Sequence, residues 1–331
     1  MVIRRVTILK LASAVLLATG VATVGVVAEA PAAHAAPARP TVSVSNSGQL
    51  TAALRKAAPG QVISLRDGTY TGRFVASRSG AGSAPITLVG SRKAVLTTGS
   101  KRAAYGLHVT GKNWVLRGFS VSNSAKGIVL DNSDNTVIDG VAVTAIGQEG
   151  IHIRTSSSHV TVRNSVVDGT GQWIAGFGEG IYVGSGVGNW REIMGSKTTP
   201  DRSDNVLIEN NRISNTAAEG IDIKEGTTGG RVARNVFKNA GYSGANYGDS
   251  WMDVKGNDYA IWDNSGSGTR LDAFQVHAPV KGWGGGNRFR NNSVAGGVPG
   301  HEVNVSSATP GNVVYCKPWK SARGLSNIKC R

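Results

Sequence analysis

The stretch AEGIDIKEG, residues 218–226, alternates apolar and charged residues, and its opening recurs along the chain. QEGIHI (residues 148–153) and GEGIYV (residues 178–183) repeat the Glu-Gly-Ile motif, and GLHVT and GIVLD, which begin at Gly106 and Gly127, repeat the alternation without the glutamate. Strict alternation of Ile and Val with other residues is typical of β-strands. A strand that recurs about every 20 to 40 residues indicates a solenoid, in which each repeat adds one turn to a coil.

A second recurrent unit predicts the turns of this coil. Each copy begins with a residue suited to the core and ends in Gly or Asn, the residues that best tolerate a left-handed turn conformation. Insertions of different length between constant strands are expected to leave the coil as loops. We predict a single β-solenoid of about eight or nine turns. The six copies end at Gly118, Gly140, Asn164, Asn210, Asn235 and Asn291.

One segment, SGQLTAALRKAAPG (residues 47–60), has a helical pattern. Its apolar residues, Leu50 and Leu54 among them, fall on one face; Ser47 is expected to cap the start, and Pro59 ends the helix. A short amphipathic helix at this position would cover the open apolar end of the coil.

The two ends of the chain carry signals of export. Residues 1–35 combine basic residues, an apolar run and an Ala-His-Ala cleavage motif, which predicts a secretory signal peptide; a membrane anchor is the alternative. The domain prediction is therefore a signal peptide over residues 1–35 and a β-helix domain over residues 36–331. Cys316 and Cys330 are the only cysteines, and in an exported protein they are expected to form a disulfide.

The formal charge of +15 favours an anionic partner. The basic residues are scattered singly, without a basic arm or an aromatic nucleic-acid motif, so we expect an acidic polysaccharide and no nucleic acid. Charge that serves only solubility is the alternative. We expect a secreted monomer that does not associate with a membrane.

The segment GQVISLRDGTYTGRFVASRSGAGSAPITLVGSRKAVL (residues 60–96) resembles the first turns of secreted uronate-polysaccharide lyases of the pectate, alginate and chondroitin types. This resemblance identifies the chain as a member of the pectate-lyase-like superfamily. It implies an all-β, right-handed parallel β-helix. The superfamily also contains hydrolases, epimerases and adhesins, so the resemblance does not fix the substrate.

The outward residues of the repeated strands form two columns on one face of the coil, because side chains alternate between the two faces of a strand. Stacked neighbours lie about 4.8 Å apart, so Asp222, Lys224, Asp253 and Lys255 are expected to form a square of alternating charge. The first column is predicted to contain His108, Val129, His152, Tyr182, Asp222, Asp253 and Gln275, and the second Thr110, Asp131, Arg154, Gly184, Lys224, Lys255 and His277.

The residues from EGIDIKEG to WMDVKGN resemble the region of the ninth polysaccharide-lyase family that carries calcium-binding acids and a catalytic lysine. The resemblance implies that Glu219 and Asp222 bind Ca²⁺, and the carboxylate of Asp253 offers a further oxygen ligand. Lyase chemistry requires a neutralised substrate carboxylate and a base, commonly Lys or Arg with a lowered pKa. The catalytic candidates are Lys224, Lys255 and Arg154.

Further residues are expected to bind sugar. His152, Tyr182 and His277 belong to the two columns. Trp173, Trp190 and Tyr247 belong to three long insertions, residues 169–179, 184–204 and 240–250, which we expect to form the walls of a groove. The alternative is that these aromatic side chains pack the loops onto the coil.

Three other interpretations of the charged square remain open. The square could be a solvated ladder of salt bridges, Asp222 and Asp253 could be the carboxylate pair of a glycoside hydrolase, or the protein could bind glycans without catalysis. Unsaturated product would indicate a lyase, reducing sugar without unsaturation a hydrolase, and neither a binding protein. Pectate, alginate, glucuronan and glycosaminoglycan all remain possible substrates.

Overall fold

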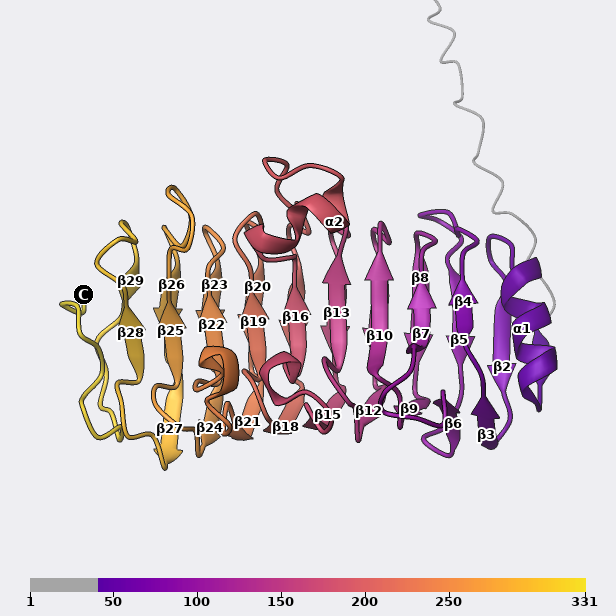
Figure 1. Cartoon of the computed structure of the whole chain (residues 1–331), viewed down its shortest axis with the longest axis horizontal. Helices are drawn as coiled ribbons and strands as arrows, with labels where there is room; N and C mark the ends of the chain where they lie inside the picture. Colours follow the sequence, from indigo (N-terminus) through magenta and orange to yellow (C-terminus); the bar gives the residue numbers. More distant parts are fainter. Residues whose placement is uncertain (1–40) are drawn as a thin grey trace, which may run out of the picture. The chain divides into compact units, whose positions relative to one another are not determined.

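The computed structural model describes residues 41–331, which form an elongated parallel β-helix (Figure 1). The strands fall into three parallel sheets of eleven, nine and nine strands, so the all-β solenoid prediction is confirmed and the coil is longer than the eight or nine turns predicted. The predicted signal peptide over residues 1–35 lies outside the described residues.

Each complete turn of the coil contributes one strand to each sheet, and β1 and β29 extend sheet 1 at its two ends. Sheet 1 contains β1 Val42–Val44, β2 Val62–Leu65, β5 Ile86–Val89, β8 Trp114–Arg117, β11 Val137–Asp139, β14 Thr161–Arg163, β17 Leu207–Glu209, β20 Arg231–Ala233, β23 Ala260–Trp262, β26 Arg288–Arg290 and β29 Val313–Val314. Sheet 2 contains β3 Gly68–Thr71, β6 Ala94–Thr97, β9 Ser120–Ser122, β12 Ala142–Thr144, β15 Val166–Thr170, β18 Arg212–Thr216, β21 Val236–Ala240, β24 Ser265–Ser267 and β27 Ser293–Gly296. Sheet 3 contains β4 Phe74–Ala76, β7 Tyr105–Val109, β10 Lys126–Asp131, β13 Ile151–Arg154, β16 Ile181–Val183, β19 Ile221–Ile223, β22 Met252–Val254, β25 Phe274–Val276 and β28 Val303–Val305.

The core is built from inward-facing columns of apolar side chains. In sheet 3, Ile128, Ile151, Ile181 and Ile221 lie in register on successive turns and are fully buried. The small glycine that precedes each isoleucine is required by the packing: a Cβ on Gly150 would lie 2.6 Å from the carbonyl oxygen of Gly180. The Glu-Gly-Ile repeat therefore encodes the coil itself.

Helix α1 (Ser47–Lys56) covers the first turns, as predicted, with Leu50 and Leu54 buried in the core. The predicted cap was wrong by one residue: Asn46, not Ser47, is the N-cap, and its side chain accepts a hydrogen bond from the Gln49 backbone N–H at 3.0 Å. An Asn is at least as good a cap as Ser, because its carbonyl oxygen reaches the unpaired N–H groups of the first turn.

The turns between sheets 1 and 2 hold a ladder of buried asparagines, Asn211, Asn235, Asn264 and Asn292. The side-chain oxygens of Asn235, Asn264 and Asn292 each accept from the backbone N–H of the asparagine one turn before, as in Asn211 N to Asn235 Oδ1 at 3.0 Å. The ladder begins at Asn211, whose oxygen accepts from the N–H of Ser165. The left-handed turn residues are Gly118, Gly140, Asn164, Asn210 and Asn291, as predicted; at the remaining position the left-handed residue is Arg234, because Asn235 belongs to the ladder.

The C-terminal segment is tied back by the disulfide between Cys316 and Cys330, the pair expected from the sequence. The three long insertions carry short helices: η1 (Ala175–Phe177), η2 (Val187–Asn189) with α2 (Trp190–Met194), and η3 (Ala245–Tyr247). In Figure 1, α2 lies at one end of the sheet 3 strands, and the loop that precedes β22 lies at the other end. Among residues 41–331, no helix has the length and apolar character needed to cross a membrane.

Candidate active site

The outward column predicted for sheet 3 is present in the structure. His108, Val129, His152, Tyr182, Asp222, Asp253 and Gln275 lie in register on seven successive strands, and Asn304 continues the column on β28.

A cavity of about 600 Å³ lies over the C-terminal half of this column. It brings together seven of the predicted site residues: Glu219, Asp222, Asp253, Lys224, Lys255, His277 and Tyr247. Its remaining lining residues are Glu179, Asn246, Asp249, Leu271, Gln275, Ala278, Pro279, Asn304 and Ser306.

Two lysines share one carboxylate at the floor of the cavity. Lys224 Nζ lies 2.5 Å from Asp222 Oδ2, and Lys255 Nζ lies 3.0 Å from Asp222 Oδ1 and also pairs with Asp253. Asp222 is 2% exposed, so these are buried ion pairs rather than a solvated ladder. Removing one partner of a buried pair leaves a charge without compensation, which costs several kcal/mol, about 3–5 in measured cases.

The pKa values of both lysines are raised, whereas the sequence indicated a lowered lysine pKa. Burial would lower the pKa of Lys224, but the charge and hydrogen bond of Asp222 outweigh burial and raise it. The pKa of Lys255 is raised in the same way by Asp222 and Asp253, against the effect of burial. The expectation of a lowered lysine pKa was wrong, because the nearest charges to each ammonium group are carboxylates rather than cations.

A column of glutamates lies at the start of the sheet 3 strands. Glu149, Glu179 and Glu219 precede the glycines of three successive turns, and all three are buried. Burial, followed by the charges of Glu149 and Asp222, raises the pKa of Glu179 to about 8. Burial and the charge of Asp222 also raise the pKa of Glu219.

The acidic residues fit a divalent cation. Glu179, Glu219 and Asp222 each offer an oxygen, and these oxygens lie within 4.8 Å of one another. Glu179 Oε2 is buried without a hydrogen-bond partner. The four buried acids at the cavity, Glu179, Glu219, Asp222 and Asp253, outnumber the two lysines there. Carboxylate oxygens are the ligands preferred by Ca²⁺. Asp253, also predicted as a ligand, pairs with Lys255 and is not one of the three acids whose oxygens lie this close together; the third is Glu179.

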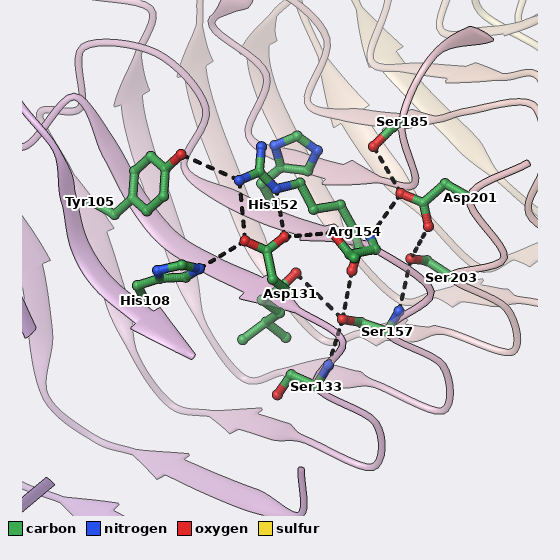
Figure 2. Close-up of polar contacts among 12 residues, drawn as sticks. Tyr105, His108, Asp131, Ser133, His152, Arg154, Ser157, Ser185, Asp201 and Ser203 are labelled. Carbon is green, nitrogen blue, oxygen red and sulfur yellow. Dashed lines mark hydrogen bonds and ion pairs between the residues drawn. The ribbon is translucent and has the colours of Figure 1, made fainter. Parts of the chain in front are cut away.

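Arg154 lies outside the cavity, in a separate polar cluster (Figure 2). Its Nε donates to Asp131 Oδ1 at 2.7 Å, and Asp131 also contacts His108 at 2.7 Å. These hydrogen bonds and the Arg154 charge outweigh burial and hold the pKa of Asp131 well below its usual range. Arg154 therefore has its own carboxylate partner and does not contribute to the setting of Lys224 and Lys255.

A neighbouring carboxylate anchors the second insertion to the coil (Figure 2). Asp201 is fully buried and accepts from the backbone N–H groups of Thr155 and Ser156, both in the left-handed conformation, and from the hydroxyls of Ser185 and Ser203. Successive N–H groups in this conformation form an anion-binding concavity. Asp201 thereby attaches the C-terminal part of the insertion 184–204 to the turn that contains Thr155 and Ser156.

His152 and Tyr182 are buried beside the cavity rather than lining it. His152 Nε2 donates to the carbonyl oxygen of Gly184 at 3.0 Å, and burial followed by the charges of Lys126 and Arg154 keeps its pKa well below the usual value. The Tyr182 ring packs edge-on against His152, and Lys224 Nζ lies 5.0 Å from its centroid. Burial and the charge of Asp222 raise the pKa of Tyr182.

The predicted aromatic residues of the loops divide into two groups. Tyr247 is 85% exposed at the cavity, and Trp173 is 43% exposed on the first insertion. Trp190, expected to contact sugar, is buried, and its Nε1 donates to the carbonyl oxygen of Ser185. The first and third insertions pack together, with Asn246 Nδ2 donating to the carbonyl oxygen of Gly176.

The prediction of site residues omitted several that line the cavity. Asn304 lies in VNV, an apolar-x-apolar strand that lacks the Gly-Ile opening of the earlier repeats. Asp249 accepts from Gln275 Nε2 at 2.8 Å, so it positions an amide of the column. Alternation alone could have identified Asn304, whereas Asp249 is on an insertion whose path the repeat does not predict.

The hydrolase interpretation is not supported by the Asp222 and Asp253 pair. A retaining pair needs one carboxyl group that keeps its proton. Lys255 bridges both carboxylates, and the charges of Lys224 and Lys255 lower the pKa of Asp222 despite its burial.

Comparisons with known proteins identify relatives of this chain. The family described as "Pel9A-like, right handed beta helix region" matches residues 32–196. An alginate lyase from Paenibacillus sp. str. FPU-7 is 41% identical with a TM-score of 0.80, over 86% of this chain and 97% of that chain.

Two pectate lyases are more distant. Pectate lyase L of Dickeya chrysanthemi is 30% identical over 149 residues, which span 38% of this chain and about a third (35%) of that protein. Pectate lyase Pel9A is 18% identical with a TM-score of 0.60, over 86% of this chain and 78% of that chain, and shares its fold. The chain therefore belongs to the right-handed parallel β-helix polysaccharide lyases.

Proposed function

We propose that the protein is a secreted lyase that cleaves an acidic, uronate-containing polysaccharide of the alginate type by β-elimination. The observation that carries the proposal is the cavity in which Lys224 and Lys255 are both held against Asp222. The similarity to the alginate lyase supports the choice of substrate, and the export signals and disulfide support secretion.

In β-elimination, a base removes the proton from the carbon beside the uronate carboxylate. The electron pair of that C–H bond forms a C=C bond, and the glycosidic oxygen leaves and takes a proton. The lysine ammonium groups suit the substrate carboxylate and the negative charge that develops on it. Lys224 in its uncharged amine form is the proposed base, because it lies between Asp222 and Tyr182, while Lys255 stays charged; the reverse assignment is the alternative.

Tyr182, buried beside the cavity, is the second proton carrier that we propose. Its ring contacts Lys224, and its pKa responds to the charges of Asp222 and Glu179, so we propose that its hydroxyl assists proton transfer to the leaving oxygen. Tyr182→Phe removes only this hydroxyl. A loss of turnover of about 10²-fold or more at unchanged melting temperature would support this role, and unchanged turnover would restrict Tyr182 to packing.

We propose Ca²⁺ as the cation held by Glu179, Glu219 and Asp222. When bound, it would supply positive charge for the substrate carboxylate. Zn²⁺ is disfavoured because the cavity offers carboxylates and no thiolate.

The activity is tested by incubating the protein with alginate, polygalacturonate, glucuronan and a glycosaminoglycan, with a neutral glucan as control. The expected result is ultraviolet absorbance from unsaturated product with alginate. Reducing ends that appear without this absorbance would indicate hydrolysis and contradict the proposal.

A further inference from the structure

The outward face of sheet 1 changes character along the coil. On its N-terminal turns, arginines alternate with acids: Arg163 pairs with Asp139 at 3.1 Å, and Arg117 lies 3.9 Å from the same carboxylate. On a later turn Arg234 pairs with Glu209. These arginines each have a carboxylate partner.

The arginines of β26 lack such partners. Arg288 and Arg290 are both exposed, they point to the same side of the strand, and within residues 41–331 no carboxylate lies at ion-pairing distance from either. In register, Ala260 and Val313 flank Arg288, so two small side chains leave space on either side of its guanidinium. The charge of this strand is therefore available to a ligand.

Aromatic rings flank the same arginines. Trp262 lies in register beside Arg290 on β23, and Tyr315, which is 41% exposed, follows β29 on the other side. Rings of this kind stack on sugars, while arginine binds carboxylates with paired N–H groups. Trp262, Arg290 and Tyr315 thus place ring, cation and ring in one row, with Arg288 two residues before Arg290, and this arrangement matches a polymer that repeats both a ring and a carboxylate.

These side chains line a hollow of about 1000 Å³. Asp263 is the one acid among its lining residues, and it accepts from Asn291 Nδ2. Lys317 also lines it, but its ammonium group is engaged by the buried Glu302 at 2.5 Å. The hollow lies on sheet 1, and it shares no lining residue with the candidate active site, which lies on sheet 3.

We propose that this hollow, lined by Arg288, Arg290, Trp262 and Tyr315, is a second, non-catalytic binding site for acidic polysaccharide. The identity of the sugar class rests on the proposed function. A polysaccharide bound to sheet 1 would keep the enzyme attached to the polymer between cleavage events at sheet 3. Only a long polysaccharide could reach both sites, so the effect is expected for long substrates only. The net positive charge of the protein would attract any polyanion over a distance, whereas the rings of Trp262 and Tyr315 would give selectivity for sugars.

The site is tested by gel retardation of the full-length protein in native gels that contain alginate, polygalacturonate or a neutral glucan. The variants are Arg288→Ala/Arg290→Ala and Trp262→Ala. The control is Arg212→Ala/Lys238→Ala, which removes the same charge from exposed positions on sheet 2. We expect the Arg288/Arg290 variant to bind acidic polymer about tenfold more weakly at low salt, with Trp262→Ala also weaker and the control near wild type.

Kinetics separate this site from the active site. Cleavage of uronate tetrasaccharides should be unchanged in the hollow variants, while KM for the long polymer should rise. Equal loss of retardation in the sheet 2 control, or equal retardation of the wild type by DNA and alginate, would show a general charge effect and overturn the proposal. Retardation without cleavage of any uronate polymer would refute the proposed function and leave the hollow supported.

Discussion

At the scale of single residues, Asp222 determines the state of the site. It is buried, it forms ion pairs with the ammonium groups of Lys224 and Lys255, and it is also one of the three possible metal ligands. A substitution that removes a lysine thus changes charge balance as well as chemistry, and Lys→Ala variants would confuse the two effects. Arginine preserves the ion pair, but its guanidinium gives up a proton far less readily than the ammonium group of lysine.

We therefore expect Lys224→Arg to reduce turnover by about 10²–10⁴-fold if Lys224 is the base, with little change in melting temperature. Lys255→Arg, which keeps its contacts with Asp222 and Asp253, should then retain much more activity. The control is Lys126→Arg, outside the cavity and paired with Glu149. Near-wild-type turnover in both Lys224→Arg and Lys255→Arg would end the hypothesis of a lysine base.

The raised lysine pKa predicts an alkaline activity profile. The basic form of a lysine whose pKa is raised is scarce at neutral pH, and its fraction grows as the pH rises toward that pKa. The value of kcat/KM should therefore increase about tenfold per pH unit above neutrality, until another step limits the rate. The measurement is kcat/KM on tetrasaccharide across pH; a flat or falling alkaline limb would assign proton removal to another group.

Which side chains share the outward column could be predicted from the sequence, because a period of two and one strand per turn fix the register from His108 to Gln275. The pairing within the square could not. The alternating order of the four charges allows either aspartate to pair with either lysine, and only the structure shows that both ammonium groups lie on Asp222. Trp190 illustrates the same limit, since a loop aromatic residue is equally suited to packing and to sugar binding.

At the scale of elements, the glutamate column predicts a stability that depends on pH and on cations. Since the pKa of Glu179 is about 8 in the folded protein and near 4.3 when unfolded, the folded state holds more protons between these values. Stability should fall as pH rises through that window. In the presence of EGTA, Glu179→Gln should raise the melting temperature at pH about 8 by several degrees and have little effect near pH 4.

The same variant tests the cation. Adding Ca²⁺ at pH about 8 should raise the melting temperature of the wild type and should have a much smaller effect on Glu179→Gln. Glu192→Gln, an exposed glutamate on α2, is the control and should respond like the wild type. Activity and melting temperature that are both insensitive to EGTA would refute the calcium proposal.

The loops predict opposite outcomes for two aromatic substitutions. Tyr247→Ala removes an exposed ring at the cavity and should raise KM for polymer several-fold without changing the melting temperature. Trp190→Ala opens a cavity under the second insertion and should cost about 3–5 kcal/mol of local or global stability. Thermal melts and initial rates distinguish them; a stability loss in Tyr247→Ala would make it a packing residue.

Helix α1 and the strands were predictable as elements because their periodicity is strong and their apolar faces are clear. The exact N-cap and the turn residue at Arg234 were not, since Ser47 and Asn46 are both good caps and the ladder position of Asn235 becomes visible only in three dimensions. Local propensity therefore predicts that a helix or strand is present, while contacts with neighbouring parts of the structure determine at which residue it begins or ends.

At the scale of the whole molecule, the disulfide should stabilise the C-terminal end of the coil. Cys316 and Cys330 are 14 residues apart, and closing a loop of this size contributes about 3 kcal/mol in the chain-entropy view. Cys316→Ser/Cys330→Ser should lower the melting temperature by a few degrees and increase amide exchange after Val314, while sheet 3 near Asp222 keeps its protection. Alkylation of both cysteines in unreduced wild-type protein would refute the pairing.

The asparagine ladder has a consequence for how this molecule can change through evolution. From β8 onward, the connection between sheets 1 and 2 always has two residues, while the connections at the other two corners of the coil vary from 3 to 23 residues. Asn235, Asn264 and Asn292 each accept from an asparagine of the turn before, so a duplicated turn would fit into this part of the stack, whereas one extra residue at that corner would break it. Lineages are thus free to lengthen the molecule by complete turns and to rebuild the loops over the groove, with the outward column kept in phase throughout.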